Sequence, residues 1–186
     1  MNRMLTALRL SNTLSVICQW AARIAGLLLF VLTAVIIYDV VGRRFFATGS
    51  FKLQELEWHL HGVIATFAFG YAYTRNAHVR IDILDKRLPA RFKLWMEFLI
   101  IVLLLLPFLA LIVYHGADFA WRAFERGEAS NGGLGLTNRW IIKSVVPVSA
   151  LLAIAGASSV ALRCLVVLRR PDLLRNPFES EGLWKR

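Results

Sequence analysis

The 186-residue chain contains little cysteine and little acid, and it has no sequence motif that is typical of an enzyme. Its two cysteines, Cys18 and Cys164, are too few for a disulfide framework and lack zinc or haem-attachment spacing, so we expect thiols outside any disulfide. No phosphate-binding loop, nucleophile elbow or pair of catalytic carboxylates can be found. These absences argue against an enzyme and against a cofactor bound through cysteine.

Long apolar runs are the main feature of the chain. Hydrophobic residues make up 58% of the sequence and the mean hydropathy is +0.58, whereas a soluble domain is nearer half apolar. The runs Phe98–Tyr114 and Ser144–Leu162 hold 17 and 19 residues without a charge or a histidine, and Ile24–Tyr38 holds 15. A helix needs roughly 20 mostly apolar residues to cross a bilayer. The sequence therefore predicts an all-α membrane protein.

Four transmembrane helices are predicted, over residues 21–41, 56–74, 94–115 and 143–164. Of the 22 Lys and Arg residues, 15 lie in the N-terminal segment, the second loop and the tail, and seven lie in the first and third loops. Because basic flanks stay on the cytoplasmic side, we expect both termini in the cytoplasm. The same arrangement explains the net charge of +10, and we expect no nucleic-acid partner.

The spans form one predicted membrane domain, residues 1–168, followed by a short polar cytoplasmic tail, residues 169–186. In residues 1–20, Leu10, Leu14 and Ile17 share one helical face, which is typical of a short helix lying in the membrane interface. A frayed N-terminal end is the other interpretation, and both stay open.

Two features of the spans concern helix packing. Small residues gather in the fourth span between Ala153 and Ser159, which predicts a seam where another helix approaches closely. Pro107 and Pro147 lie within the third and fourth spans, where a missing backbone donor can kink a helix. Plain helix geometry is the alternative explanation for each proline.

Ionisable residues near the spans are few. Asp39, in the last turn of the first span, can pair with Arg43 four residues later, or it is an interfacial residue with water access. Glu55 and Glu57 open the second span, where free N–H groups and the helix dipole favour carboxylates.

Histidines support a second class of function. His59 and His61 near the start of the second span, and His115 near the end of the third, all lie toward the predicted outer face. One histidine from each of two helices can ligate a haem, as in membrane anchors of respiratory dehydrogenases. Since His59 and His61 are two residues apart, only one of them can pair with His115. Interfacial histidine without a ligand is the alternative, and our preferred interpretation includes no cofactor and no metal.

Four sequence elements, in order, resemble the small membrane subunit of tripartite ATP-independent periplasmic transporters, the DctQ-type family. The elements are Tyr38–Phe45 at the end of the first span, Leu53–Trp58 at the start of the second, His78–Asp82 after it, and Asn138–Lys143 before the fourth. The resemblance covers roughly residues 20–168, and the His-Val-Arg-Ile-Asp element at His78–Asp82 is the most specific part of it.

The resemblance implies a multi-pass protein of a bacterial inner membrane that works as a scaffold. In that family a periplasmic binding protein delivers an organic acid to a membrane pair of one small and one large subunit. The large subunit moves as an elevator with cation coupling, commonly by sodium, and the small subunit braces it. Membrane phospholipids are further expected partners at the basic cytoplasmic side. The haem anchor, and after it a standalone channel or transporter, remain the alternatives.

The resemblance also implies residues for the subunit interface or for docking. Arg43, Arg44, Glu55 and Trp58 are expected near the outer end, and four more residues are expected at the inner end, namely Arg75, His78, Arg80 and Asp82. One departure from the family pattern is that Glu55 and Glu57 are separated by Leu56, whereas many members have adjacent acids there. A role for the second acid is therefore not carried over.

Overall fold

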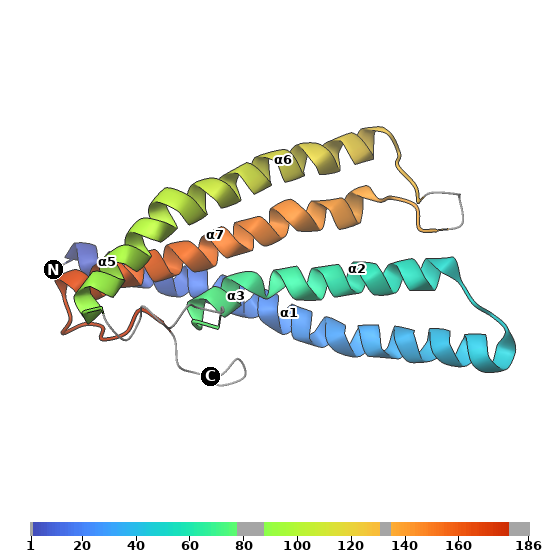
Figure 1. The fold of residues 1–186 in the computed structure, drawn as a ribbon, viewed down its shortest axis with the longest axis horizontal. Coiled ribbons are helices and arrows are strands. Elements are labelled where there is room, and N and C mark those ends of the chain that lie inside the picture. The colour runs from blue at the N-terminus through green and yellow to red at the C-terminus, as the bar shows by residue number, and fades with distance from the viewer. Residues whose placement is uncertain (1, 78–87, 131–134, 179–186) are drawn as a thin grey trace.

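The computed structural model describes residues 2–77, 88–130 and 135–178, and the regular structure within them is entirely helical (Figure 1). The prediction of an all-α protein is confirmed. In chain order the elements are α1 Asn2–Phe46, α2 Phe51–Phe67, α3 Phe69–Thr74, α5 Ala90–Ile100, a π-helical turn Ile101–Leu105, α6 Leu106–Glu125 and α7 Trp140–Arg169.

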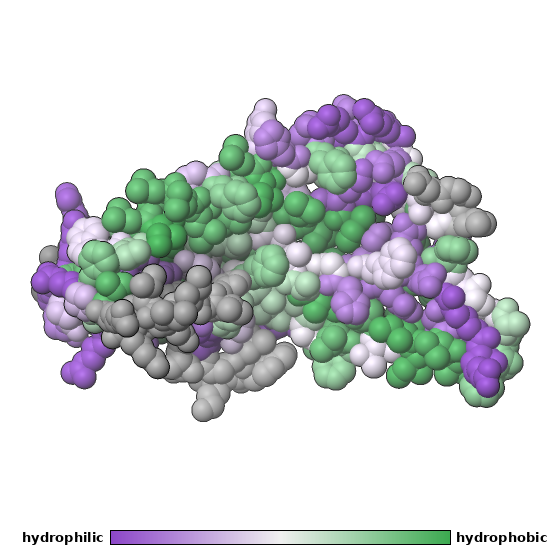
Figure 2. Space-filling view, viewed as in Figure 1, coloured by the Kyte–Doolittle hydropathy of each residue, from purple (hydrophilic) through white to green (hydrophobic). Residues whose placement is uncertain are grey.

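The helices form two long antiparallel hairpins (Figure 1). Helix α1 returns through residues 47–50 into α2 and α3, and α5–α6 returns through residues 126–139 into α7. Both returns lie at one end of the bundle, here called the loop end, and the N-terminus lies at the other, the terminal end (Figure 1). Figure 2 shows hydrophilic side chains gathered toward the two ends, with apolar ones over much of the surface between.

Helix α7 is the central element of the bundle. It packs against α6 on one side and against α1, α2 and α3 on the other. The most apolar stretch of 18 residues differs in burial between the long helices. In α7, 56% of that stretch is buried, whereas the buried share is 17% in α1 and 11% in the α5–α6 segment. The outward faces of α1 and α6 are therefore large and apolar, as expected where lipid or another protein takes the place of water.

Three of the predicted spans correspond to helices long and apolar enough to cross a membrane, which are Arg3–Phe46, Ala90–Glu125 and Trp140–Arg169. The second predicted span, residues 56–74, is divided between α2 and α3, with a break at Ala68. No proline lies there. Instead, α3 approaches α7 at Gly70, where a methyl group would lie 2.3 Å from the carbonyl oxygen of Leu152.

The approach of α3 to α7 depends on two glycines. A methyl group at Gly156 would lie 2.3 Å from the carbonyl oxygen of Gly70, closer than real carbon atoms approach, so the two backbones are in direct contact. The Cys18 thiol of α1 also meets this crossing and donates to the carbonyl oxygen of Leu152 at 3.4 Å. Three helices therefore meet at one point, which bears out the packing seam predicted around Gly156.

Helix α1 is continuous from Asn2 to Phe46, so the prediction of a separate interfacial helix, or of a frayed end, in residues 1–20 is wrong. Its buried side chains include one row that recurs every seven residues, made of Ser11, Cys18, Ala25, Leu32 and Asp39, each no more than 6% exposed. Ser15, Ala21 and Ala22 are buried beside this row. Because seven residues make almost two helical turns, the row keeps nearly the same direction along the helix.

A polar cluster attaches the N-terminal part of α1 to the last turns of α7. The Ser159 hydroxyl donates to the carbonyl oxygen of Ser11 at 2.9 Å, and the Arg163 guanidinium donates to Ser11 Oγ at 2.8 Å and to Asn12 Oδ1 at 3.0 Å. Arg163 is 6% exposed. These bonds compensate the desolvation of the hydroxyls and hold residues 2–20 against α7 as part of the continuous helix α1.

The two prolines differ in effect. Pro107 follows the π-helical turn Ile101–Leu105 at the start of α6, so its missing N–H falls where the regular helical hydrogen bonding is already interrupted. Pro147 lies inside α7, buried near Gly116, whose missing side chain leaves room for the proline ring. The two buried cysteines form no disulfide in the described residues, as expected.

Candidate functional site

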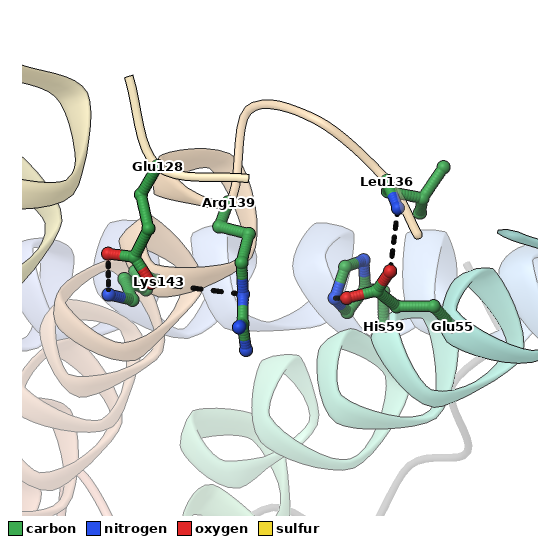
Figure 3. A network of polar contacts seen from close by, with 6 residues as sticks. All are labelled: Glu55, His59, Glu128, Leu136, Arg139 and Lys143. Atoms are coloured by element: carbon green, nitrogen blue, oxygen red, sulfur yellow. Dashed lines mark hydrogen bonds and ion pairs between the residues drawn. The ribbon is translucent and has the colours of Figure 1, made fainter. Parts of the chain in front are cut away.

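The polar groups that converge most closely lie at the loop end, where the α6–α7 return folds over α2 (Figure 3). The Glu55 carboxylate of α2 accepts a hydrogen bond from the Leu136 backbone N–H at 2.7 Å. This donation, with a smaller one from Ser130, holds the pKa of Glu55 below its usual range. His59, one turn along α2, places Nε2 3.9 Å from Glu55 Oε1. Glu55 therefore attaches the return to the α1–α2 hairpin.

A second half of the network holds the two ends of the return together (Figure 3). Glu128 forms an ion pair with Lys143, and Arg139 Nε lies 4.0 Å from Glu128 Oε1. The Arg139 backbone N–H also donates to the Glu128 carbonyl oxygen at 3.0 Å. The Lys143 side chain, donating to Glu128, lowers the pKa of that carboxyl. Lys143 further sits 4.0 Å from the Phe119 ring centroid, so it joins α6 to α7 as well.

Glycine and asparagine give the return its shape. Gly127 has a φ of 55° directly after the α6 C-cap, a conformation that favours glycine and ends the helix. Gly135 lies against Glu55, because a methyl group there would be 2.2 Å from Oε2. The Ser130 backbone N–H donates to the Leu136 carbonyl oxygen at 3.1 Å, and Asn138 has a φ of 62° just before α7. The Leu136 N–H is thereby aimed at α2.

A pocket of about 570 Å³ opens beside Glu55. Its lining comes from α2, from the return and from α7, and consists of Phe51, Gln54, Glu55, Trp58, His59, Ser130, Gly135, Arg139 and Ile142. A smaller apolar pocket of about 290 Å³ continues it between α2 and α7, and the two share His59 and Ile142. The groove thus has a charged mouth at the loop end and an apolar floor.

The structure changes the explanation predicted for Glu55 and Glu57. Helix α2 begins at Phe51, so Glu55 lies in the second turn and neither acid caps the helix; the helix-dipole explanation is wrong. The N–H that Glu55 binds comes from the other hairpin, 81 residues away. Glu57 Oε1 is buried and has no hydrogen-bond donor among the described residues.

The ion pair predicted between Asp39 and Arg43 is confirmed, with Nε 2.7 Å from Oδ2. Asp39 is 6% exposed, and its other carboxylate oxygen has no donor in the described part of the chain. Arg44 and Trp58 are exposed side chains of the loop end. Of the outer-end residues, the structure therefore brings Glu55 and Trp58 to one pocket and places Arg43 with Asp39 on α1.

Of the predicted inner-end residues, Arg75 lies just after α3, with its Cζ 5.0 Å from the Tyr71 ring centroid. His78, Arg80 and Asp82 lie outside the described residues. Five members of the loop-end network were not predicted from the sequence, namely Ser130, Leu136, Glu128, Arg139 and Lys143. The glycines of the return signalled only a turn, and a backbone N–H donor leaves no mark in a sequence.

The histidines proposed as haem ligands do not converge. His59 lines the loop-end pocket on α2, His61 is exposed, and His115 on α6 is exposed with its ring against Tyr114. Helix α7 lies between α2 and α6 (Figure 1). No group of three or more His, Cys, Asp or Glu residues suited to a metal ion occurs within the described ranges.

A family model described as "Tripartite ATP-independent periplasmic transporters, DctQ component" matches residues 32–167. No curated protein matches the chain. The matched residues include the loop-end network and most of α7, and they begin in the middle of α1.

Proposed function

Because this chain belongs to the DctQ family of tripartite ATP-independent periplasmic transporters, we propose that it is the small scaffold subunit of such a transporter. In this proposal it braces a large elevator-type subunit in a bacterial inner membrane. The large subunit carries out cation-coupled uptake, with sodium as the coupling ion, of an organic acid delivered by a periplasmic binding protein. The family match over residues 32–167 is the observation that carries the proposal.

The distribution of polar groups supports a bracing role for this chain rather than a role as the transport path. Between Phe98 and Tyr114 in the third apolar run, and between Ser144 and Leu162 in α7, the sequence has no ionisable side chain. A path for an organic anion needs cationic or hydrogen-bonding groups at the depth of the bilayer. The polar network described above lies instead at the loop end, where it holds two hairpins together.

We place the loop end in the periplasm and both termini in the cytoplasm, with α2–α3 as the fourth crossing. The excess of Lys and Arg in the N-terminal segment, the second loop and the tail supports this orientation. The pocket beside Glu55 and Trp58 then faces the compartment of the binding protein and is the proposed docking surface, near Arg43 and Arg44. The basic cytoplasmic side is the proposed contact for phospholipid head groups.

Affinity purification of this chain from its native membrane tests the proposal. We expect a large multi-span subunit to co-purify in a fixed ratio, and a soluble periplasmic protein to join after mild cross-linking. A flavin or iron–sulfur subunit in its place, together with a haem absorption band, would refute the scaffold function in favour of the respiratory anchor.

A further inference from the structure

Two pockets at the loop end join into one groove, which runs inward from the charged mouth beside Glu55. The outer pocket, of about 570 Å³, and the inner one, of about 290 Å³, share His59 and Ile142. The inner pocket forms the floor of the groove between α2 and α7, and its apolar lining includes Leu56, Leu60, Val63, Ile141 and Val145. Because Val63 is eight residues beyond Glu55, the groove descends about 12 Å along α2.

The floor of the groove and its mouth lie in different surroundings. With α2–α3 as the fourth crossing, as proposed above, Val63 falls within the span of residues 56–74, and Val145 falls within the uncharged run Ser144–Leu162. The mouth has charged groups instead, next to the indole of Trp58, which is 70% exposed. Tryptophan is enriched where hydrocarbon meets the lipid head groups. A ligand that fills the whole groove is therefore amphiphilic.

The mouth presents one carboxylate and one guanidinium, from α2 and from the start of α7 (Figure 3). The Leu136 N–H binds Oε2 of Glu55, whereas Oε1 has His59 Nε2 at 3.9 Å, which is longer than a hydrogen bond. The Arg139 side chain is 32% exposed, and its 4.0 Å contact with Glu128 Oε1 is made by Nε. Its terminal NH₂ groups are therefore able to bind an oxyanion at the mouth.

The width of the groove limits what can occupy it. A helix with its side chains is about 10–12 Å across, so it cannot enter a 290 Å³ space between two helices that pack against each other. A soluble protein reaches the mouth but not a floor at the depth of the bilayer. A phospholipid reaches both, since its acyl chain fits the floor and its head group remains at the mouth.

The two charges at the mouth determine which head group fits. An anionic head group would bring a second negative charge beside Glu55, whereas a zwitterionic one places each of its charges against an opposite charge. A primary ammonium donates hydrogen bonds to a carboxylate, and a quaternary ammonium has no N–H to donate. The guanidinium of Arg139 matches the oxygens of a phosphate. Phosphoethanolamine has both of the required groups.

We propose that the loop-end groove binds one phosphatidylethanolamine molecule, with its phosphate on Arg139, its ammonium on Glu55 and one acyl chain between α2 and α7. The inference rests on the function and orientation proposed above, which place this lipid in the periplasmic leaflet. Its head group then forms part of the surface at which the binding protein docks.

A photoactivatable lipid tests the position of the acyl chain. The transporter complex is reconstituted in vesicles with phosphatidylethanolamine that carries a diazirine in one acyl chain, and the adducts are mapped by mass spectrometry. We expect adducts on the floor of the groove, and we expect Val63→Trp, which fills the floor, to lower them about fivefold or more. Leu104→Trp, on the exposed face of α6, is the matched control and should leave them unchanged. Equal labelling of the groove and of the α6 face, or no loss of adducts in Val63→Trp, would overturn the proposal.

Native mass spectrometry of the complex tests the head group. After exchange into phosphatidylethanolamine, phosphatidylcholine or phosphatidylglycerol, we expect the first to be retained about tenfold more than the other two. Arg139→Gln should lose this retention and Arg139→Lys should keep part of it, whereas Arg126→Gln, an exposed charge at the same end, should not change it. Equal retention of the three lipids, or full retention in Arg139→Gln, would contradict the assignment of the head group.

The same preparations separate a failure of this inference from a failure of the proposed function. If the unchanged chain retains no large subunit, the proposed function itself fails. If the large subunit is present and phosphatidylethanolamine is not retained, the function stands and this inference alone is wrong.

Discussion

The outward faces of α1 and α6 have similar exposure and different chemistry. The most apolar windows of these two segments are 17% and 11% buried, so exposure alone would assign both faces to the same surroundings. The α5–α6 segment has no charged side chain from Phe98 to Tyr114, whereas α1 has Arg23 directly before its uncharged run Ile24–Tyr38, with the guanidinium over the Trp20 ring. The two faces therefore differ in their polar groups and not in how much of them is buried.

The inner sides of the two segments differ as well. Helix α1 meets α7 through a thiol, hydroxyls and a guanidinium, at Cys18, Ser11 and Arg163. Helix α6 meets α7 through small residues such as Gly116 and Ala120, with the Lys143 contact to Phe119 near the loop end. The α1 side of α7 thus has directional hydrogen bonds, which fix one register between the two helices.

The largest effect is expected from a single methyl group added to α7. In Gly156→Ala the methyl group would lie 2.3 Å from the Gly70 carbonyl oxygen, so α7 must move away from α3 and α1. We expect this to lower the free energy of unfolding by more than about 3 kcal/mol. Gly116→Ala is the matched change on the α6 side, where the methyl group would lie 3.2 Å from Pro147 Cδ. We expect it to change the free energy of unfolding by less than about 1 kcal/mol. Thermal unfolding followed by a thiol-reactive dye at buried Cys18 and Cys164 measures both. Similar melting temperatures would contradict the direct backbone contact.

A smaller effect is expected at the terminal end. Arg163→Met leaves the Ser11 and Asn12 side chains without their charged donor, and we expect it to destabilise the attachment of residues 2–20 by about 2 kcal/mol. Trypsin cleavage after the exposed Arg9 reports the release of this part of α1. We expect faster cleavage for Arg163→Met and no change for Arg169→Met, whose side chain is exposed. An unchanged cleavage rate in Arg163→Met would show that the cluster does not hold α1.

The smallest effect is expected at the loop end. Glu55→Gln weakens the bond to the Leu136 N–H by about 1 kcal/mol, which predicts roughly fivefold less protection of that amide from hydrogen exchange. Because the pKa of Glu55 is lowered in the folded chain, ionised Glu55 stabilises the fold at pH values above the ordinary carboxyl pKa of 4.5. This stabilisation is lost as the pH falls below that value. In the unchanged chain, the protection of the Leu136 amide from hydrogen exchange, relative to its intrinsic exchange rate, should therefore be constant from neutral pH to about 5 and then decline. A decline centred near neutral pH would contradict the assignment of this linkage to Glu55.

Hydropathy was enough to predict the all-helical class and three spanning helices, because a bilayer admits only long apolar helices with internal hydrogen bonds. The Asp39–Arg43 pair followed from spacing along one helix. The continuity of α1 could not be predicted in this way, because it depends on Ser159 and Arg163, about 150 residues away. The break at Ala68 likewise depends on where Gly70 meets Gly156.

The candidate site was predicted less well than the fold. Glu55 and Trp58 were identified through the family resemblance, yet the partner of Glu55 is a backbone N–H of a glycine-rich return. Side-chain types do not show which backbone donor a loop will aim at a carboxylate. The haem alternative was based on equal depth along two helices, and depth says nothing of α7, which lies between them.

Uptake into proteoliposomes tests the scaffold function most directly. Vesicles would contain this chain alone, the large subunit alone, or both, with the co-purified binding protein, its organic acid in labelled form and a sodium gradient outside. We expect uptake with both membrane chains and none with this chain alone. Sodium-driven uptake by this chain alone would contradict it, because α1, α6 and α7 would then have to provide a path that their apolar surfaces lack.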